Sequence, residues 1–245
     1  MKITGKVAVI TGASRGIGKA TAIELAQRGA FVIVNYRGSE AAALETVAEI
    51  KSAGGDAVCM AWDVSDYAEC EKNIKQIIDT FGRIDILVNN AGITRDDLLM
   101  KLSEEDFDAV IAANLKGTFC MLHFLSRQML RQRSGKIINI SSIWGDAGAS
   151  CEVLYSTTKG GINAFTKALA KEVAASNIQV NAIAFGMIDT EMNAEFDEED
   201  LALIKEEIPA DYIASPKEAA QMVYHVATSP AYMTGQVITF SGGWY

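Results

Sequence analysis

Residues 11–18 read Thr-Gly-Ala-Ser-Arg-Gly-Ile-Gly and join an apolar run, residues 6–11, to a segment of helical period that ends near residues 28–29. Glycines allow a tight turn and a close backbone approach, and the free N–H groups of a helix N-terminus attract a pyrophosphate. Any tight strand-helix junction can use such glycines, but this one lies in the first βαβ unit. We therefore interpret it as a nucleotide-binding loop. The cofactor contacts assigned to it are Gly12, Ser14, Arg15, Gly16, Ile17 and Gly18.

Outward from this loop, short runs rich in β-branched residues alternate with longer segments of helical period, which indicates βαβ units and a parallel sheet. The expected strands are residues 6–11, 30–35, 56–62, 84–89, 136–141, 179–184 and 237–240. Most are apolar nearly throughout, as when helices cover both faces of a sheet. We predict a single doubly wound, Rossmann-type α/β domain over residues 1–245, with a seven-stranded parallel sheet and its ligand crevice at the carboxyl ends of the strands.

Composition narrows the possible partners. The formal net charge of −9 opposes binding to nucleic acid or to anionic lipid. No run reaches the roughly 18 uninterrupted apolar residues of a membrane span, and the N-terminus carries no secretory leader. The four cysteines, Cys59, Cys70, Cys120 and Cys151, are spaced too widely for a zinc site or a CxxC motif. We expect a cytoplasmic protein with reduced thiols and no metal.

The end of the second expected strand bears on the choice of cofactor. An NAD site usually places an acidic residue there to bind the ribose hydroxyls, whereas this chain has Asn35-Tyr36-Arg37. No carboxylate would repel a 2′-phosphate, and Arg15 and Arg37 could both reach one. The pattern favours NADP(H), with Asn35 and Arg37 as contacts, although Arg37 could also be a solvated loop residue.

Two later strand ends open onto the same crevice. Asp63 and Val64 close the third strand, where they can meet an adenine edge. Residues 89–92, Asn-Asn-Ala-Gly, close the fourth strand, and their small side chains permit close approach. The cofactor contacts assigned to this segment are Asn89, Ala91 and Gly92.

The fifth strand ends at Ser141 and Ser142, and Tyr155 and Lys159 lie four residues apart, on one face of the next helix. Lowering a phenol pKa from about 10 to about 7 requires roughly 4 kcal/mol. Lys159, with the positive charge of an oxidised nicotinamide, can supply it, so Tyr155 and Lys159 are also counted as cofactor contacts. Tyr155 would protonate a carbonyl oxygen that Ser142 hydrogen-bonds. Taken singly, each residue could instead be structural: a turn cap, a packed ring or an ordinary helical lysine.

The glycine loop, the Asn-Asn-Ala-Gly segment and the Ser-Tyr-Lys set together resemble the short-chain dehydrogenase/reductase family over essentially the whole chain. Residues 93–101 and 114–119 are similar to the 3-oxoacyl-[acyl-carrier-protein] reductases of that family. The resemblance implies reduction of a carrier-bound ketone by NADPH, within a homotetramer. It also implies that Asn114 holds a water in a proton relay to Lys159, and that Ile188 and Thr190 contact the nicotinamide end of the cofactor.

Some residues depart from that pattern. Phe185-Gly186 replaces the family's Pro-Gly, Ala210-Asp211-Tyr212 replaces its Gly-Arg region, and Ser176 stands where carrier-protein reductases often have a basic residue. Residues 142–145 with 149–153 are similar to a different branch, which reduces an aminopentanone group on a lysine of elongation factor P. A non-catalytic nucleotide-binding scaffold is the third hypothesis.

Three further segments give expectations. The acidic stretch of residues 191–207 is either a mobile lid over the substrate or a solvated helix face. The helical stretches 106–131 and 155–175 are apolar on more than one face, which suggests an interface between helices. A basic cluster could dock an acyl carrier protein, or simply complement a helix dipole. It comprises Arg127, Arg131, Arg133 and Lys136.

Overall fold

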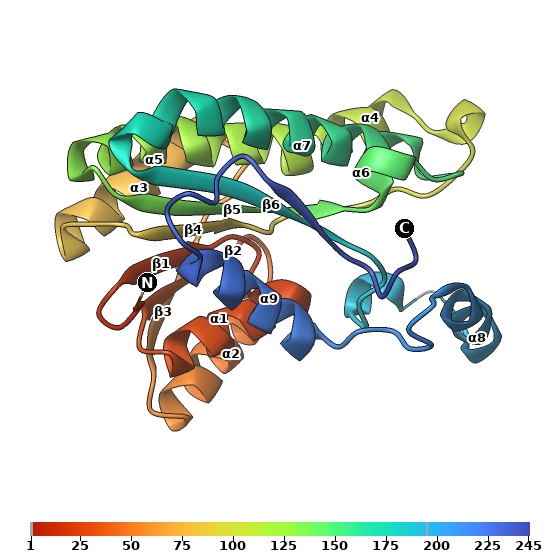
Figure 1. Cartoon of the computed structure of the whole chain (residues 1–245), viewed down its shortest axis with the longest axis horizontal. Helices are drawn as coiled ribbons and strands as arrows, with labels where there is room; N and C mark the ends of the chain where they lie inside the picture. The colour runs from red at the N-terminus through yellow and green to blue at the C-terminus, as the bar shows by residue number, and fades with distance from the viewer. Residues whose placement is uncertain (1, 195) are drawn as a thin grey trace.

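A computed structural model describes residues 2–194 and 196–245 and places one parallel sheet between two layers of helices (Figure 1). The seven strands lie in the order β3-β2-β1-β4-β5-β6-β7. Their bounds are Val7–Ile10 (β1), Phe31–Tyr36 (β2), Asp56–Ala61 (β3), Ile86–Asn89 (β4), Gly135–Ser142 (β5), Ile178–Phe185 (β6) and Val237–Phe240 (β7). The predicted doubly wound α/β fold is confirmed, and the strand ends differ from the prediction by one or two residues.

The two faces of the sheet bury separate apolar clusters, which explains the nearly continuous apolar strands. In β1, Ala8 and Ile10 pack on the face covered by α1, α2 and α9, whereas Val7 and Val9 pack on the face covered by α3, α5 and α7. The α-helices are Gly16–Gln27 (α1), Glu40–Ser52 (α2), Tyr67–Phe81 (α3), Glu104–Val110 (α4), Gly117–Gln132 (α5), Trp144–Ala147 (α6), Val153–Val173 (α7), Glu198–Glu207 (α8) and Pro216–Thr228 (α9). Alternation along each strand therefore holds both helical layers to one sheet.

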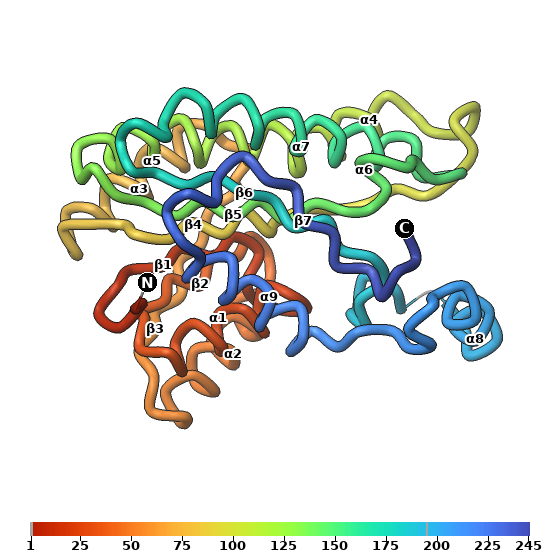
Figure 2. The backbone as a smooth tube through the Cα atoms, viewed as in Figure 1, coloured from red at the N-terminus to blue at the C-terminus, as the bar shows by residue number. Residues whose placement is uncertain are grey.

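The strand order creates a crevice between β1 and β4. The chain runs outward from β1 to β2 and β3, then returns to β4 on the other side of β1, as the tube in Figure 2 shows. Connections leave the two neighbouring strands in opposite directions at such a point, so the carboxyl edge opens there. The segments that follow β1 and β4 are brought side by side.

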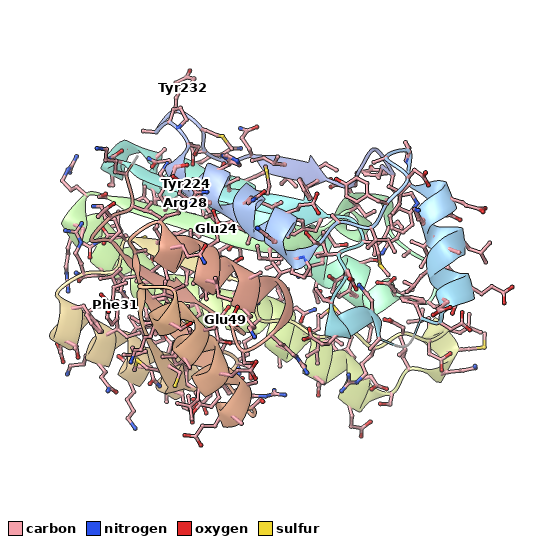
Figure 3. The ribbon with its side chains drawn as sticks, turned by 90° about the horizontal axis from the view of Figure 1, so that it is seen from below. Glu24, Arg28, Phe31, Glu49, Tyr224 and Tyr232 are labelled. Atoms are coloured by element: carbon pink, nitrogen blue, oxygen red, sulfur yellow. The ribbon has the colours of Figure 1, made fainter. Side chains whose placement is uncertain are left out.

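An ionic and aromatic contact ties α1 to α9. The Arg28 guanidinium lies 4.6 Å from the centre of the Tyr224 ring, and its Nη2 lies 2.9 Å from Oε1 of the nearly buried Glu24 (Figure 3). A cation over an aromatic face is attracted by the ring quadrupole. This contact supports the helix that begins at the glycine loop.

The helical stretch expected over residues 106–131 is present as one helix, Glu104–Gln132. Its α-helical parts, α4 and α5, are joined by a π-helical segment, Ile111–Lys116. By length and composition alone Glu104–Gln132 could cross a membrane, but Met121, Leu122 and Leu125 are buried in the core. One such helix in a layered α/β fold is explained by this packing. The second expected helix, 155–175, corresponds to α7.

The acidic stretch forms a capped helix that stands apart from the two layers (Figure 1). The Asp197 carboxylate accepts the backbone N–H groups of Glu199 and Asp200 at 2.9 Å. Acidic residues in the first turn also complement the helix dipole. The sequence after β6 therefore encodes a short helix, α8, beside the carboxyl edge of the sheet.

Candidate active site

Two glycines let the loop after β1 pack directly against neighbouring backbone. Gly12 has φ +61°, and a Cβ on it would lie 2.9 Å from the Cα of Ala91. A Cβ on Gly18 would lie 2.4 Å from the carbonyl oxygen of Gly12. Any larger residue would force the loop and the start of α1 apart.

Asn90 and Thr11 lock this loop to the segment after β4, and neither was singled out from the sequence. Asn90 Nδ2 donates to the carbonyls of Thr11 (2.9 Å) and Gly12 (3.0 Å). Thr11 Oγ1 accepts the N–H groups of Asn90 (2.9 Å) and Ala91 (3.0 Å). Asn89, the predicted contact, points to the opposite face and donates to Asn139 at 2.8 Å. Strand alternation was the signal that could have separated the two asparagines.

A cavity of about 570 Å³ runs along the carboxyl ends of β1, β2, β3 and β4. Its predicted lining residues are Gly12, Ser14, Arg15, Gly16, Ile17, Asn35, Arg37, Asp63, Val64, Ala91, Gly92 and Thr190. Among the described residues no side chain caps α1, and its first turn contains no acidic residue. The free N–H groups and positive dipole end there remain available to an anion. An elongated cavity with this anion site fits a dinucleotide.

At the β2 and β3 end of this cavity, Arg37 Nη1 lies 3.4 Å from Asp63 Oδ2. Burial raises the pKa of Asp63, but hydrogen bonds from Ser65 and the charge of Arg37 outweigh it, so the pKa stays below its usual value. Asn35 is buried, and its Oδ1 accepts the Gly12 N–H at 3.1 Å while its Nδ2 donates to the Trp62 carbonyl. Arg37 is thus the exposed cation at this end, and Asn35 supports the loop from below.

The three residues predicted to catalyse the reaction meet at the end of β5. Ser142 is the last residue of that strand, and Tyr155 and Lys159 lie in the first two turns of α7. Lys159 Nζ donates to the carbonyl of Ile140 at 2.8 Å and lies 5.2 Å from the centre of the Tyr155 ring. A Cβ on Gly145 would lie 2.8 Å from the carbonyl carbon of Lys159, so α6 packs tightly on α7. This packing holds the serine beside the phenol.

Burial controls the protonation of both ionisable groups. It lowers the pKa of Lys159 to about 8. It also raises the pKa of Tyr155, which Glu152 and Asp96 raise further and a hydrogen bond with Ser142 lowers. We expected Lys159 and an oxidised nicotinamide to lower this pKa, whereas burial and the two carboxylates together raise it. The phenol is therefore protonated at neutral pH and can act as a proton donor.

Asn114 lies in the π-helix, between the cofactor cavity and α7. Its Oδ1 accepts the Ile93 N–H at 2.8 Å, and its Nδ2 donates to the Ile93 carbonyl (2.9 Å) and Thr158 Oγ1 (3.1 Å). A Cβ on Gly92 would lie 3.2 Å from Asn114 Oδ1 and 3.8 Å from Lys159 Nζ. The side chain thus positions the segment after β4, and its water-holding role stays a prediction.

A second cavity, of about 310 Å³, lies over the catalytic residues. Ser142, Tyr155, Lys159, Ile188 and Thr190 line it, and Thr190 lines the cofactor cavity as well. The remainder combines large apolar side chains with two carboxylates: Trp144, Phe185, Met187, Phe196, Ile204, Trp244, Asp96 and Glu152. A carbonyl compound placed here would meet the phenol, the serine hydroxyl and the end of the dinucleotide cavity together.

The basic cluster predicted to dock a carrier protein is not at this cavity. Arg131 and Arg133 are exposed, but they precede β5, whereas Ser142 ends it. Lys136 is buried and donates to the Ser229 carbonyl at 2.8 Å, so its assignment to a surface patch is wrong. The arginines lie at the edge of the sheet opposite the catalytic residues.

Comparison with known proteins agrees with this geometry. The sequence model described as short chain dehydrogenase matches residues 6–201. A 3-oxoacyl-[acyl-carrier-protein] reductase of Synechocystis sp. is 46% identical over 243 residues, covering 98% of this chain and 97% of the relative. A protein of the same description from Staphylococcus aureus is 44% identical and covers 100% of both chains.

One solved structure is also closely similar. It comes from Agrobacterium tumefaciens, its proposed activity is that of a gluconate dehydrogenase, and it matches with a TM-score of 0.95. The sequence identity is 33%, over 99% of this chain and 97% of the other. The same fold thus accompanies different named substrates, so the substrate has to be argued from the site.

Proposed function

This chain belongs to the short-chain dehydrogenase family, and we propose that it reduces the ketone of a 3-oxoacyl-[acyl-carrier-protein] to a secondary alcohol with NADPH. The observation that carries the proposal is the meeting of Ser142, Tyr155 and Lys159 in a cavity that adjoins a dinucleotide-sized cleft. Relatives that match over nearly the whole chain support the carrier-bound substrate, because they are named as reductases of it.

The chain's own residues can perform the proton transfer of this reaction. When bound, the nicotinamide cofactor supplies the hydride that the carbonyl carbon receives. Tyr155 can donate its phenolic proton to the carbonyl oxygen, since its pKa is raised and the proton is present at neutral pH. Ser142 Oγ can hydrogen-bond the same oxygen as negative charge develops on it. The Lys159 ammonium then stabilises the phenolate that remains.

Arg37 and the absence of a carboxylate at the end of β2 support NADPH over NADH. The residue at that position, Asn35, is buried and uncharged, so nothing there repels a 2′-phosphate. Arg37 lines the cavity, and an Arg guanidinium suits a phosphate by charge and by geometry.

A direct rate comparison tests the proposal. The purified enzyme should oxidise NADPH with a 3-oxoacyl carrier thioester, and Tyr155→Phe should lower turnover by about 10² to 10⁴ while cofactor affinity stays nearly constant. No NADPH oxidation with any member of a ketone panel would refute the proposal and favour a non-catalytic scaffold. Near-normal turnover in the variant would refute the assigned proton donor.

One observation favours a second candidate substrate. Asp96 and Glu152 line the catalytic cavity, and both raise the Tyr155 pKa through charge, so both act on the reacting position. An uncharged acyl chain has no use for two carboxylates, whereas an ammonium group would be stabilised by them and by the neighbouring Trp144 ring. This favours the aminopentanone group on a lysine of elongation factor P.

Glu152→Gln separates the two substrates, because it removes the charge and keeps the size. We expect the variant to slow reduction of the modified elongation factor by about tenfold while reduction of the carrier thioester holds or improves. If Glu152→Gln leaves the rate with the modified elongation factor unchanged, as with the carrier thioester, the second candidate is eliminated.

We also propose that the protein is cytoplasmic and assembles as a homotetramer. Several large apolar side chains on α3, α4 and α5 support assembly because they are about 40 to 50% exposed: Tyr67 (43%), Phe107 (47%), Phe119 (43%) and Leu130 (41%). Such faces are commonly covered in oligomers. A stable monomer in size-exclusion chromatography with light scattering would contradict the proposal.

A further inference from the structure

The C-terminal residues turn back from β7 toward the catalytic cavity. Gly242 and Gly243 have φ +64° and +86°, which only glycine adopts readily. A Cβ on Gly242 would lie 2.8 Å from Ile208 Cγ2, and its carbonyl accepts the Ala210 N–H at 2.9 Å. The tail is therefore packed on the segment that follows α8, and the C terminus lies between α6 and α8 (Figure 1).

This turn places Trp244 between two elements of the cavity wall. Its indole contacts the Trp144 ring edge-on, with centroids 5.2 Å apart and an interplanar angle of 69°. Its Nε1 donates to Oε2 of Glu207, the last residue of α8, at 3.2 Å. The indole thus joins α6 to α8 across the cavity.

The contact with Trp144 also reaches the reacting centre. The Trp144 backbone N–H donates to Ser142 Oγ at 3.2 Å, so the backbone that carries this ring is held next to the catalytic serine. Trp244 and Ile204 of α8 line the same cavity as Ser142. The Trp244 ring is therefore held in place by Trp144 on one side and by Glu207 on the other.

We propose that Trp244 forms the distal wall of the substrate cavity and limits the length of the chain that a ketone substrate can carry beyond its reacting carbonyl. This inference rests on the proposed ketone reduction. The cavity has a volume of about 310 Å³, and it includes residues predicted to meet the nicotinamide, Ile188 and Thr190. The room left for substrate suits a short chain, and a longer one would have to displace the indole.

Chain length is the variable that tests the wall. Carrier-free 3-oxoacyl thioesters of short, medium and long chains should show kcat/KM falling steeply with length in the unaltered enzyme. Trp244→Ala should raise the ratio of long-chain to short-chain kcat/KM by about tenfold or more, since one methylene alone is worth roughly tenfold or more in a closed pocket. Trp244→Phe keeps an aromatic ring and should fall between the two.

Two further variants distinguish the effect of the Trp244 indole from that of the residues next to it. Tyr245→Ala changes the adjoining side chain, which is 59% exposed, and should leave the profile unchanged. Glu207→Gln weakens the hydrogen bond to the indole and should relax the profile less than Trp244→Ala. Thermal unfolding of each variant checks that the tail change has not altered the whole fold.

Equilibrium binding keeps this inference distinct from the proposed function. The same thioesters are titrated into enzyme carrying Tyr155→Phe, with and without Trp244→Ala. Relaxed discrimination against long chains in the double variant supports the wall, even if the unaltered enzyme reduces none of them. An unchanged length profile in both binding and turnover, or an equal loss for every length, would overturn it.

Discussion

Two demands on Lys159 oppose each other, because the amine that we propose stabilises the phenolate is also buried, where it donates to the Ile140 carbonyl. Burial lowers its pKa from 10.5 to about 8. Below about 8 the amine is charged in both states, so folding must bury a charge; above 10.5 it is neutral in both. The loss of folding free energy is therefore largest at neutral pH and disappears as the pH rises from about 8 to 10.5.

Replacing this lysine should therefore stabilise the protein while destroying its activity. We expect Lys159→Met to abolish reduction and to raise the free energy of unfolding at neutral pH by up to about 3 kcal/mol. The gain should shrink to nothing in alkaline solution. Urea unfolding across pH measures it, with Lys167→Met, an exposed lysine of the same helix, as the control. A variant less stable than the unaltered protein at neutral pH would contradict the account of burial.

Arg37 supplies the residue-scale prediction on cofactor choice. Arg37→Asp places a carboxylate beside Asp63 and removes a partner for the 2′-phosphate. We expect the NADPH-to-NADH ratio of kcat/KM to fall by about tenfold or more, the size of a lost charged hydrogen bond. Lys51→Asp makes the same charge change at an exposed site at the end of α2 and should leave the ratio unaltered. A preference of the unaltered enzyme for NADH would refute the proposed role of Arg37 in NADPH binding.

The place of a single residue could be predicted where its position in a helix or strand determines which way its side chain points. Tyr155 and Lys159 share a helix face by spacing alone, and the structure brings them together at Ser142. The Asn-Asn motif did not show which of Asn89 and Asn90 faces the cavity, because that depends on which residue of the strand end points to which side of the sheet. The burial of Lys136 could not be predicted, because a lysine near exposed arginines gives no local sign that the distant Ser229 carbonyl will accept a hydrogen bond from it.

At the scale of elements, the glycine loop makes the sharpest prediction. A Cβ at residue 18 would meet the Gly12 carbonyl at 2.4 Å and Asn90 Nδ2 at 2.5 Å, so it must disturb the hydrogen bonds that join the segments after β1 and β4. We expect Gly18→Ala to lower stability by about 2 kcal/mol or more and to weaken NADPH binding at least as much. Gly38→Ala is the control for stability alone, since a Cβ there meets nothing within 4 Å but Gly38 lines the cofactor cavity. Unfolding of both variants and cofactor titration of Gly18→Ala decide the outcome.

Whole helices and strands could be predicted when a single hydrophobic pattern extends along their full length. The strands inside the sheet are largely buried on both faces and the edge strands β3 and β7 are partly exposed, but each apolar run marks its strand to within two residues. The π-helix at Ile111–Lys116 could not be read in this way, because a one-residue widening of the turn leaves the apolar pattern on either side intact. The tail that carries Trp244 was also missed, because its role depends on a turn at Gly242 and a partner in α8.

At the scale of the whole molecule, charge and topology act together on the proposed carrier partner. The protein is acidic, with a net charge of −9, so docking to an acidic carrier requires local cations. At roughly 3.3 Å per residue, the eight residues of β5 place its two ends about 23 Å apart. Arg131 and Arg133 lie beyond the far end, whereas Arg95 is 51% exposed and lines the cofactor cavity beside the catalytic one.

Charge reversal at the two edges should therefore have unequal effects. Because Arg95 lines the cofactor cavity, the comparison is made at saturating NADPH. We then expect Arg95→Glu to raise the KM for a carrier-bound thioester several-fold and to leave a small ketone nearly unaffected, because of the two substrates only the carrier presents an acidic surface. Arg131→Glu combined with Arg133→Glu should change neither KM. Added salt should mimic Arg95→Glu, since exposed charges are screened beyond about 10 Å at 0.1 M ionic strength. If the double variant at the opposite edge raises the carrier KM instead, the carrier approaches across the amino ends of the strands, and the assignment of docking to the catalytic edge is wrong.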